Sequence, residues 1–352
     1  MKDKMKVTVA MSGGIDSAVA ALIAIDSGYE VSGATMRLCP KITNNNDAFE
    51  SDISDAAEVC KQLGIPHRVL DMRAAFHNTV IKDFIDTYYA GGTPNPCIVC
   101  NKTMKFGAFL DEEIAMGADY IATGHYARIE EQDGRFLLKK AADKNKDQTY
   151  MLWSLSQHQL SHTLFPLGDM TKPEIRALGE ARGFVIAHKS DSQDICFVPD
   201  GDYASFIERE LGEKYPVGNY IDEDGNILGR HKGQIHYTIG QRKGLGISMG
   251  RHIFVAKKDA EANTVTLTDE DRLFTKTVVL KGINLIPFDK IDGKIRVKAK
   301  IRYRHAESEA YAEQTGEDEI TLTFDQPQRA PAKGQSAVMY DGDIVVGGGI
   351  IQ

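Results

Sequence analysis

Residues 6–17 read KVTVAMSGGIDS, and this stretch decides the fold. The apolar run that ends at Met11 is typical of a short buried strand, and the two glycines that follow indicate a turn. Apolar side chains then recur at helical spacing, at Ala18, Ala21, Leu22 and Ile25. A strand that passes through a glycine-rich turn into a helix is the first unit of an open α/β sheet, and such sheets bind ligands at the carboxyl ends of their strands.

The alternation of strand and helix continues to about residue 208. Further strands are expected at residues 30–36, 68–71 and 119–123, and further helices at 54–63, 76–88 and from Thr171 onward. Alternating elements predict parallel strands with helices on both faces of the sheet. Residues 1–208 are therefore predicted to form a doubly wound parallel-sheet nucleotide-binding domain.

The pattern changes beyond about residue 212. Three Asp-Gly pairs, at residues 224–225, 292–293 and 341–342, indicate turns. Alternating strand-like segments accompany them, at residues 252–256, 264–268, 295–303, 320–324 and 337–340. We predict a small, β-rich linking domain over residues 209–272 and a C-terminal β-barrel over residues 273–352, with a sandwich as the alternative to the barrel. The polar run at residues 43–47 is expected to be a mobile loop.

Bulk properties narrow the class of protein. The chain has 352 residues, no apolar run long enough for a membrane span and no apolar segment of signal-peptide length at its start, so a cytoplasmic protein with no membrane partner is expected. Five cysteines, an odd number, do not make a disulfide framework. The net charge of −8 argues weakly against a nucleic-acid partner, but binding depends on local patches.

The turn at residues 12–17 has the composition of a phosphate site. Gly13 and Gly14 allow backbone N–H groups to approach phosphate oxygens, and the helix that follows adds partial positive charge. Ser12 and Ser17 can donate hydroxyl hydrogen bonds, and Asp16 can hold Mg²⁺ against the phosphates. The loop of P-loop NTPases is excluded because no Gly-Lys-Ser/Thr follows. SGGIDS resembles the loop of the ATP-pyrophosphatase group, which implies that ATP is cleaved between its α and β phosphates and that AMP activates a carbonyl oxygen.

Two cysteine motifs lie far apart in the sequence. The first, GTPNPCIVCNK at residues 92–102, contains Cys97 and Cys100, and the second, DSQDICF at residues 191–197, contains Cys196. A thiolate near a helix N-terminus or near Lys102 would be reactive because its pKa would be lowered. The two other cysteines, Cys39 and Cys60, lie within strand and helix patterns and are expected to be buried thiols.

Together with these cysteines, the segments TPNPCIVCNKTMKF, ATGHYA, KDQTYML, SDSQDICF and YTIGQRKGLGI resemble the tRNA-uridine 2-sulfurtransferase family over nearly the whole chain. The resemblance implies an adenine nucleotide alpha hydrolase-like N-terminal domain. It implies ATP contacts from Ala10, Met11, Ser12, Gly13, Gly14, Ile15, Asp16, Ser17, Met36 and Gly124. It also implies that Cys196 carries persulfide sulfur and that Cys100 is its partner.

The same resemblance implies the contacts with tRNA. The target uridine is expected against Asn95, Pro96 and Cys97, and further contacts are expected from Lys146, Asp147 and Gln148 and from Arg302 and Tyr303. Many members of the family have Asp, a candidate general base, where this chain has Cys97. Cys97 could act as the base or only bind, or Cys97, Cys100 and Cys196 could hold a [4Fe–4S] cluster with one iron open to sulfide. Structural zinc is a further alternative that needs a fourth ligand.

Residues 294–304 carry a cation at every second position, namely Lys294, Arg296, Lys298, Lys300, Arg302 and Arg304. Because alternate side chains of a strand share a face, one face should be basic and able to contact RNA phosphates, with a plain solvated face as the alternative. Residues 241–243 (Gln-Arg-Lys) offer a second, weaker basic site. His125 could touch a ligand or be packed, and Trp153 is expected in the core.

These expectations combine into one function, the ATP- and Mg²⁺-dependent 2-thiolation of the wobble uridine, position 34, of tRNA. The C2 oxygen of a flipped-out uridine would be adenylated, persulfide sulfur would attack C2, and AMP and pyrophosphate would be released. The expected partners are tRNAs such as those for Lys, Glu and Gln and a cysteine desulfurase or sulfur-relay protein. The alternatives are thiolation through a [4Fe–4S] cluster, an AMP-forming ligase for a small metabolite, and a non-catalytic RNA-binding module.

Overall fold

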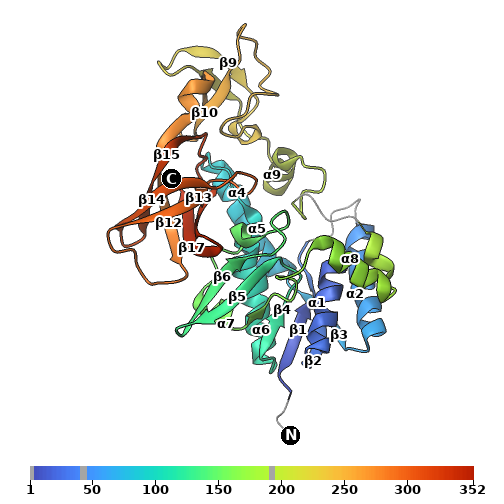
Figure 1. Cartoon of the computed structure of the whole chain (residues 1–352). Helices are drawn as coiled ribbons and strands as arrows, with labels where there is room; N and C mark the ends of the chain where they lie inside the picture. The colour runs from blue at the N-terminus through green and yellow to red at the C-terminus, as the bar shows by residue number, and fades with distance from the viewer. Residues whose placement is uncertain (1–3, 40–45, 190–194) are drawn as a thin grey trace. The chain divides into compact units, whose positions relative to one another are not determined.

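The computed structural model describes residues 4–39, 46–189 and 195–352, and the chain divides into two compact units (Figure 1). Unit 1 contains residues 1–80, 97–193 and 342–346, and unit 2 contains residues 81–96, 194–341 and 347–352. The chain therefore passes from one unit to the other several times. Each unit is described here by itself.

An open parallel sheet forms the centre of unit 1. Among the described residues it has five strands in the order β3-β2-β1-β4-β7, and the registers pair Val9 with Gly33 on one side and with Ala122 on the other. The strands are β1 (Lys6–Ala10), β2 (Glu30–Arg37), β3 (His67–Asp71), β4 (Tyr120–Ala122) and β7 (Thr163–Leu164). The order reverses at β1, and the turn after β1 is thus the switch point at which such sheets bind ligands. The prediction of a parallel α/β sheet is confirmed.

Helices connect these strands in unit 1. They are α1 (Ile15–Asp26), α2 (Asn46–Leu63), α3 (Arg73–Phe76), α5 (Pro96–Cys100), α6 (Phe109–Ala115), α7 (Gln157–Ser161) and α8 (Lys172–Ala181), with the π-helical segment η2 (Asn101–Ala108) and the 3₁₀ turns η3 (Thr149–Met151) and η4 (Val185–His188). The π-helical η1 (His77–Ile81) lies at the boundary between the units. The helix start predicted at Thr171 is present, because the Thr171 N–H donates to the Glu174 carboxylate at 2.7 Å. The polar run predicted to be a loop is helical at Asn46 and Asp47, and its first residues lie outside the described ones.

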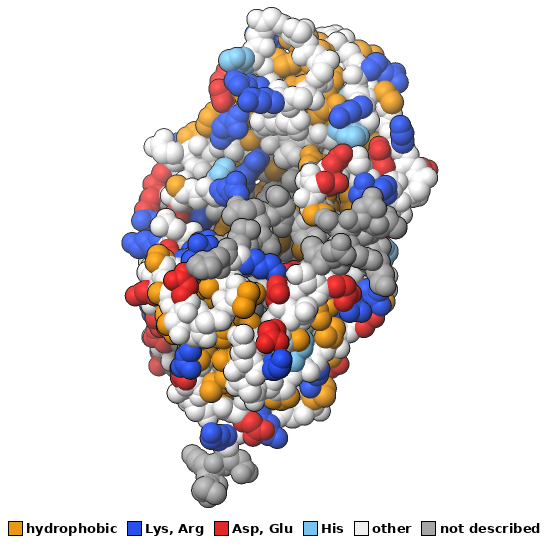
Figure 2. All heavy atoms as spheres, turned by 90° about the vertical axis from the view of Figure 1, so that its right-hand side faces the viewer, with side chains coloured by type: hydrophobic (Ala, Val, Ile, Leu, Met, Phe, Trp, Pro, Cys, Tyr) orange, Lys and Arg blue, Asp and Glu red, His pale blue; other side chains and the backbone are white. Residues whose placement is uncertain are grey.

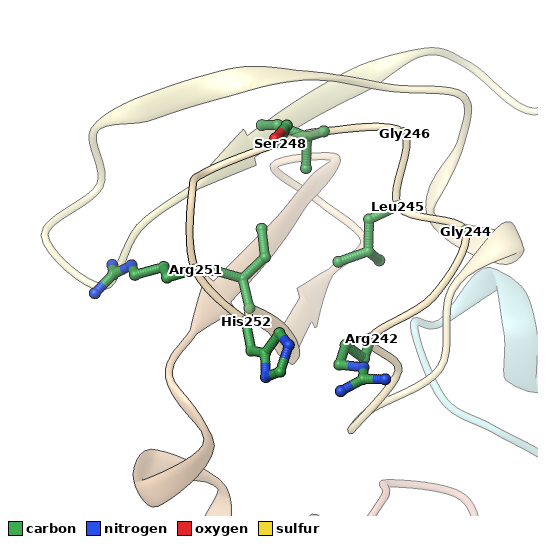
Figure 3. A pocket seen from close by; sticks show the side chains of 9 residues that line it. Arg242, Gly244, Leu245, Gly246, Ser248, Arg251 and His252 are labelled. Carbon is green, nitrogen blue, oxygen red and sulfur yellow. The ribbon is translucent and has the colours of Figure 1, made fainter.

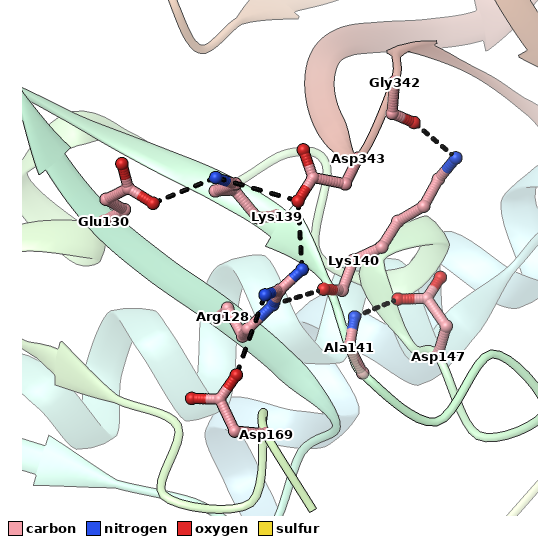
Figure 4. A network of polar contacts seen from close by, with 9 residues as sticks. All are labelled: Arg128, Glu130, Lys139, Lys140, Ala141, Asp147, Asp169, Gly342 and Asp343. Carbon is pink, nitrogen blue, oxygen red and sulfur yellow. Dashed lines mark hydrogen bonds and ion pairs between the residues drawn. The ribbon is translucent and has the colours of Figure 1, made fainter.

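A hairpin of β5 (Ala127–Gln132) and β6 (Arg135–Lys140) completes unit 1 together with residues 342–346 (Figure 4). Lys139 of β6 pairs in antiparallel register with Ile344. Arg128 donates to the backbone oxygen of Lys140 at 2.7 Å and to the Asp343 carboxylate at 3.0 Å. A segment close to the C-terminus is thereby fixed to the hairpin.

Unit 2 contains a small mixed sheet, the middle domain. In the described chain it has four strands in the order β10-β11-β8-β9, and only the β11–β8 pairing is parallel. The strands are β8 (Gly218–Ile221), β9 (Ile227–His231), β10 (Phe254–Asp259) and β11 (Thr264–Thr268), preceded by α9 (Tyr203–Leu211) and accompanied by the short turns η5 (Gln234–His236) and η6 (Glu270–Leu273). The turn predicted at residues 224–225 joins β8 to β9.

The last strands form the predicted antiparallel barrel. Over the described residues it has six strands in the order β12-β15-β14-β13-β16-β17, and the additional β12–β17 pairing closes it. The strands are β12 (Phe274–Leu285), β13 (Lys294–Lys300), β14 (Ser308–Gly316), β15 (Glu319–Arg329), β16 (Ser336–Asp341) and β17 (Ile344–Ile351). The strand predicted at residues 295–303 is shorter than expected, because it ends at Lys300 and Arg302 and Tyr303 lie in a turn.

The helix α4 (Lys82–Tyr89) belongs to unit 2, although it lies between stretches of unit 1 in the sequence. Phe84 is fully buried and meets the rings of Phe197 and Phe206 edge-on, and Tyr88 stacks on Tyr203 at 5.0 Å. Of the helices in the described ranges, none combines the length and apolar content that a membrane span requires.

Candidate functional site

The glycine turn after β1 presents unpaired donors at the switch point. Ser17 closes the turn, because its hydroxyl donates to the Gly14 oxygen at 2.9 Å and accepts from the Ser12 N–H at 3.2 Å. Within the described part of the chain, no protein group accepts a hydrogen bond from the N–H of Gly13 or Gly14. These donors, at the start of the 12-residue helix α1, fit the phosphates of a nucleotide.

Two glycines of the predicted ATP site are required by close packing. Gly13 has φ +72°, and a Cβ there would lie 2.3 Å from the backbone oxygen of Asp52 in α2. A Cβ on Gly124 would lie 2.8 Å from the backbone of Asp16 and 2.9 Å from the N atom of Ser17. Gly124, which follows β4, is therefore brought against the turn that follows β1, although the two are more than 100 residues apart in sequence.

The strands hold the remaining predicted ATP contacts at the same edge of the sheet. Ala10 ends β1, and the backbone of Met11 is fixed by Ala34 at 2.8 Å and by the Thr35 hydroxyl at 2.9 Å. Met36 lies near the carboxyl end of β2 and is half-buried. The predicted ATP residues in the ranges 10–17, 36 and 124 thus share one edge of the sheet in unit 1.

Asp16, predicted to hold Mg²⁺, is engaged by two side chains that sequence analysis did not identify. The Lys172 ammonium lies 2.8 Å and 2.9 Å from the two carboxylate oxygens, and the Tyr126 hydroxyl donates to one of them at 2.8 Å. Lys172 is only 7% exposed, and its charge is therefore directed at Asp16 rather than at solvent. A cation at the start of α8 beside the phosphate turn is suited to neutralising phosphate charge.

The His125 ring is packed among protein groups. Its ring lies 5.6 Å from Phe106 and 6.0 Å from Phe165, and its Nδ1 is 2.8 Å from the Thr123 hydroxyl. Burial lowers the pKa of His125 well below its usual value. The ring is therefore neutral, and the packed alternative describes it. Trp153 is buried, as predicted.

The cysteines differ in exposure. Cys39 and Cys60 are buried as expected, and burial raises the pKa of the Cys60 thiol to about 11. Cys97 and Cys100 lie on α5, where Cys97 is exposed and Cys100 is 8% exposed, and Cys196 is exposed. Cys97 and Cys100 belong to unit 1 and Cys196 to unit 2. No group of three His, Cys, Asp or Glu side chains in the described ranges could hold a metal ion.

The loop before Cys97 is held by distant parts of unit 2. The buried Lys258 donates to the Gly92 oxygen at 2.9 Å, and Gln234 donates to the Tyr89 oxygen at 3.3 Å. Two barrel residues hold its other end, since the Thr93 N–H donates to the Lys333 oxygen at 2.7 Å and the Gln335 amide lies 3.1 Å from the oxygens of Thr93 and Pro94. The middle domain and the barrel therefore fix the backbone that leads to Asn95 and Pro96.

Lys146, Asp147 and Gln148, the residues predicted to contact tRNA, also make hydrogen bonds that hold their loop in place. Asp147 accepts from the Ala141 N–H at 3.0 Å and from the Thr149 hydroxyl at 2.7 Å. Gln148 accepts from the Tyr126 N–H at 2.9 Å through its side chain, and the Lys146 N–H closes a turn onto the Asp143 oxygen. Gln148 thereby supports the tyrosine that donates to Asp16.

The basic strand is largely compensated by acids of neighbouring strands. The pairs are Lys294–Glu313 at 3.2 Å, Arg296–Glu309 at 3.0 Å, Arg296–Asp325 at 2.6 Å and Lys298–Glu309 at 3.6 Å. The Arg296 guanidinium also lowers the pKa of the Asp325 carboxyl. Three of the six cations on the predicted basic face are therefore compensated by acids of β14 and β15. Contact between this face and RNA phosphates stays a prediction.

Arg302, predicted to contact tRNA, points at backbone. Its Nη2 donates to the Ile239 oxygen at 3.0 Å and to the Ala330 oxygen at 2.9 Å. Tyr303 lies beside Lys300, whose Nζ is 5.8 Å from the ring centroid. Arg302 thus ties the turn after β13 to the loop that precedes β10.

Family descriptions match the chain in three successive stretches. The tRNA methyl transferase HUP domain matches residues 5–200, the tRNA methyl transferase PRC-barrel domain residues 204–269, and the aminomethyltransferase beta-barrel domain residues 275–351. The parallel sheet with its glycine turn thus belongs to a HUP domain, and the chain carries two further β domains.

Relatives identify the family more narrowly. The tRNA-specific 2-thiouridylase MnmA of Acetivibrio thermocellus is 48% identical over 99% of this chain and 99% of the relative. The proteins of the same name from Clostridioides difficile and Treponema denticola are 48% and 47% identical, each over 99% of this chain and 98% of the relative. The chain belongs to the tRNA-specific 2-thiouridylase family. Membership rests on these full-length relatives, because the matched domains are described by a methyl transferase activity and the relatives by 2-thiouridylation.

Proposed function

We propose that the chain catalyses the ATP-dependent 2-thiolation of the wobble uridine, position 34, of tRNA. The observation that carries the proposal is full-length similarity to 2-thiouridylases in a chain whose phosphate turn lies at the switch point of a parallel sheet. The unpaired N–H groups of Gly13 and Gly14 support ATP binding at that turn. A small-metabolite ligase would explain the turn, but not the similarity over both β domains.

In the nucleotide step, the C2 oxygen of the uridine attacks the α-phosphorus of ATP and pyrophosphate leaves. The donors of residues 13 and 14 and the Lys172 ammonium offset the charge that develops on the departing pyrophosphate. Asp16, at 2.8 Å from Lys172, would hold Mg²⁺ against the phosphates, which supplies further charge neutralisation. The uridine loses its N3 proton when C2–O–AMP forms, and the exposed Cys97 is the candidate acceptor of that proton.

In the sulfur step, the terminal sulfur of a Cys196 persulfide attacks C2, and AMP leaves with the former C2 oxygen. The Cys100 thiolate then attacks the Cys196 sulfur, which breaks the S–S bond and frees the thiocarbonyl, while N3 regains a proton. The product on the protein is a Cys100–Cys196 disulfide, and two electrons from an external thiol reductant restore the two thiols. In the alternative order, Cys100 first releases hydrosulfide, which attacks C2. The competing arrangement, a [4Fe–4S] cluster held by Cys97, Cys100 and Cys196, has no support in the described ranges, where no three such side chains are placed to hold a metal ion.

The proposal extends to partners and location. The substrates would be tRNAs with a wobble uridine, such as those for Lys, Glu and Gln, bound in part by Asn95, Pro96 and Cys97. A cysteine desulfurase or a sulfur-relay protein would reload Cys196, whose exposure suits transfer from a protein donor. Such a reaction belongs in the cytoplasm.

The test compares Cys196→Ala and Cys100→Ala with the wild type and with Cys60→Ala, a buried thiol outside the site. We expect both variants to lose 2-thiouridine in tRNA, measured by nucleoside mass spectrometry, while tRNA-dependent pyrophosphate release persists. Unchanged thiolation in both variants rejects the sulfur step. Pyrophosphate release that does not depend on tRNA favours the small-metabolite ligase. Iron content and a visible spectrum of anaerobically purified protein distinguish the cluster.

A further inference from the structure

A long glycine-rich loop of the middle domain is not used by the proposed reaction. Residues 240–253 read GQRKGLGISMGRHI and connect η5 to β10. The loop contains three cations and one histidine but no acidic residue, in a chain whose net charge is −8. On the face drawn in Figure 2, Lys and Arg side chains gather with few acids over the middle domain at the top of the view.

The loop has a fixed base. Gly240 and Gln241 exchange backbone hydrogen bonds with Val255 at 2.8 Å and 3.0 Å. The Tyr220 hydroxyl donates to the Leu245 oxygen at 2.6 Å. Leu245 and Ile253 are buried in the core of the middle domain. A loop anchored by two buried side chains and these hydrogen bonds presents its exposed groups in one arrangement.

The anchored loop lines a wide, open cavity of about 570 Å³ on the surface of the middle domain (Figure 3). Leu245, Ile247 and Ile253 supply apolar lining, and Gly244 and Gly246 leave the backbone accessible. Arg242 and His252 both line this cavity, and in Figure 3 Arg251 points away from them.

The cations of the loop differ in whether they are compensated. Arg251 is paired with the Asp269 carboxylate at 2.7 Å. Arg242 and Lys243 are exposed, and neither has an ion-pair partner in the part of the chain that the structure describes. The contrast with the basic strand is direct, because Arg296 there is paired with two acids. The rim at Arg242 and His252 is thus an uncompensated donor site next to accessible backbone N–H groups.

We propose that this cavity binds a backbone phosphate of the tRNA, with Arg242 and His252 as donors, so that the middle domain positions the RNA without reading its sequence. The inference rests on the proposed function, since it assumes that tRNA is the substrate. A guanidinium provides paired donors that match the oxygens of a phosphate group. His252 is the only ring that lines the cavity among the described residues, and the site therefore lacks the aromatic platform on which a base would stack.

The experiment measures the affinity of the full-length protein for unmodified tRNA by fluorescence anisotropy, over a series of KCl concentrations. Arg242→Gln and His252→Gln are compared with Arg251→Gln, the matched control whose charge is already compensated. We expect Arg242→Gln to weaken binding about fivefold to tenfold and to lower the slope of log affinity against log salt by about 0.7 to 0.9, the loss of one phosphate contact. His252→Gln should also weaken binding, and Arg251→Gln should leave the slope unchanged.

Each other outcome overturns the inference. An unchanged slope in Arg242→Gln, or an equal change in Arg251→Gln, means that the cavity makes no specific phosphate contact. Saturable binding of inorganic phosphate, measured by calorimetry at constant ionic strength and abolished in Arg242→Gln while tRNA affinity is kept, means that a free anion is the ligand. In these cases wild-type thiolation of tRNA still supports the proposed function, which fails separately if the wild type makes no 2-thiouridine.

Discussion

Replacing the buried Lys258 should change how stability depends on pH. Lys258 is 8% exposed, donates to the Gly92 oxygen at 2.9 Å and lies 5.4 Å from the centroid of the Tyr88 ring. Burial lowers its pKa from 10.5 to about 7, because the charged ammonium is poorly solvated there. Lys258→Met keeps much of the volume but removes the titration. Its neighbour Lys257, whose side chain is 71% exposed, supplies the matched control Lys257→Met.

The direction and size of this pH dependence of stability follow from proton linkage. Between pH 7 and pH 10.5 the unfolded chain binds more protons at Lys258 than the folded chain does, and the wild type therefore gains stability as the pH rises through this window. Below pH 7 the full cost of holding the charge is present, and above pH 10.5 it is gone. The unfolding free energy then rises by roughly 1.4 kcal/mol per pH unit, and by about half of that close to pH 7, where Lys258 is half-protonated in the folded chain. The wild type should therefore gain about 2 kcal/mol of stability from pH 7 to pH 9. The lost hydrogen bond to Gly92 only adds an offset that does not vary with pH.

The assay is urea unfolding followed by far-ultraviolet circular dichroism at pH 7, 8 and 9. The difference in unfolding free energy between the wild type and Lys258→Met should rise by about 2 kcal/mol over this range, while Lys257→Met should track the wild type. A carbon-13 spectrum of ε-labelled lysines should show one resonance that titrates near neutral pH and is missing from Lys258→Met. A flat difference, with every lysine titrating above pH 10, refutes the reasoning.

Further predictions concern unit 1. Gly13→Ala should lower kcat/KM for ATP roughly tenfold or more, measured by tRNA-dependent pyrophosphate release, because φ at Gly13 is positive and a Cβ would lie 2.3 Å from the Asp52 oxygen. The control Gly28→Ala also has a positive φ but open space around it, and it should only destabilise the fold by about 1 kcal/mol. Lys172→Gln should slow the same reaction about a hundredfold and Lys172→Arg should restore part of it, whereas the exposed Lys61→Gln should have no effect. Arg68→Met should cost about 3 kcal/mol in urea unfolding followed by Trp153 fluorescence, because it leaves the Glu113 carboxylate buried and unpaired; normal stability in that variant contradicts a structural role for the pair.

Local patterns in the sequence predicted several elements of the fold. The short apolar run before residue 12, the glycine turn and the helical spacing after it predict the strand, turn and helix that form β1 and α1, since each depends on neighbouring residues only. The capping signal at Thr171 and the hairpin turn at residues 224–225 are local in the same sense. Alternating side chains also predicted three of the barrel strands, β13, β15 and β16.

Pairings between distant residues were not visible in the sequence. Lys172 meets Asp16 across 156 positions, and no pattern near either residue indicates the other. The acids that compensate Arg296 lie on other strands, so the charge of that face depends on strand register. Arg302 was assigned to a strand, but the strand ends at Lys300 and the guanidinium donates to two carbonyls. Its contact with tRNA stays a prediction.

Residues 81–96 belong to unit 2 although unit 1 flanks them in the sequence, and this limits which fragments of the enzyme can be expressed separately. A fragment that ended near residue 208 would lack Lys258, Gln335 and the backbone of Lys333, and the carbonyl of Gly92 and the N–H of Thr93 would lose their partners. Tyr88, now 5% exposed, would also lose the lysine over its ring. The segment that leads into Cys97 would then be unsupported, and a nucleotide-binding piece made alone would be prone to aggregate. Recombination that exchanges the β domains between relatives should therefore succeed only when residues 81–96 are exchanged with them.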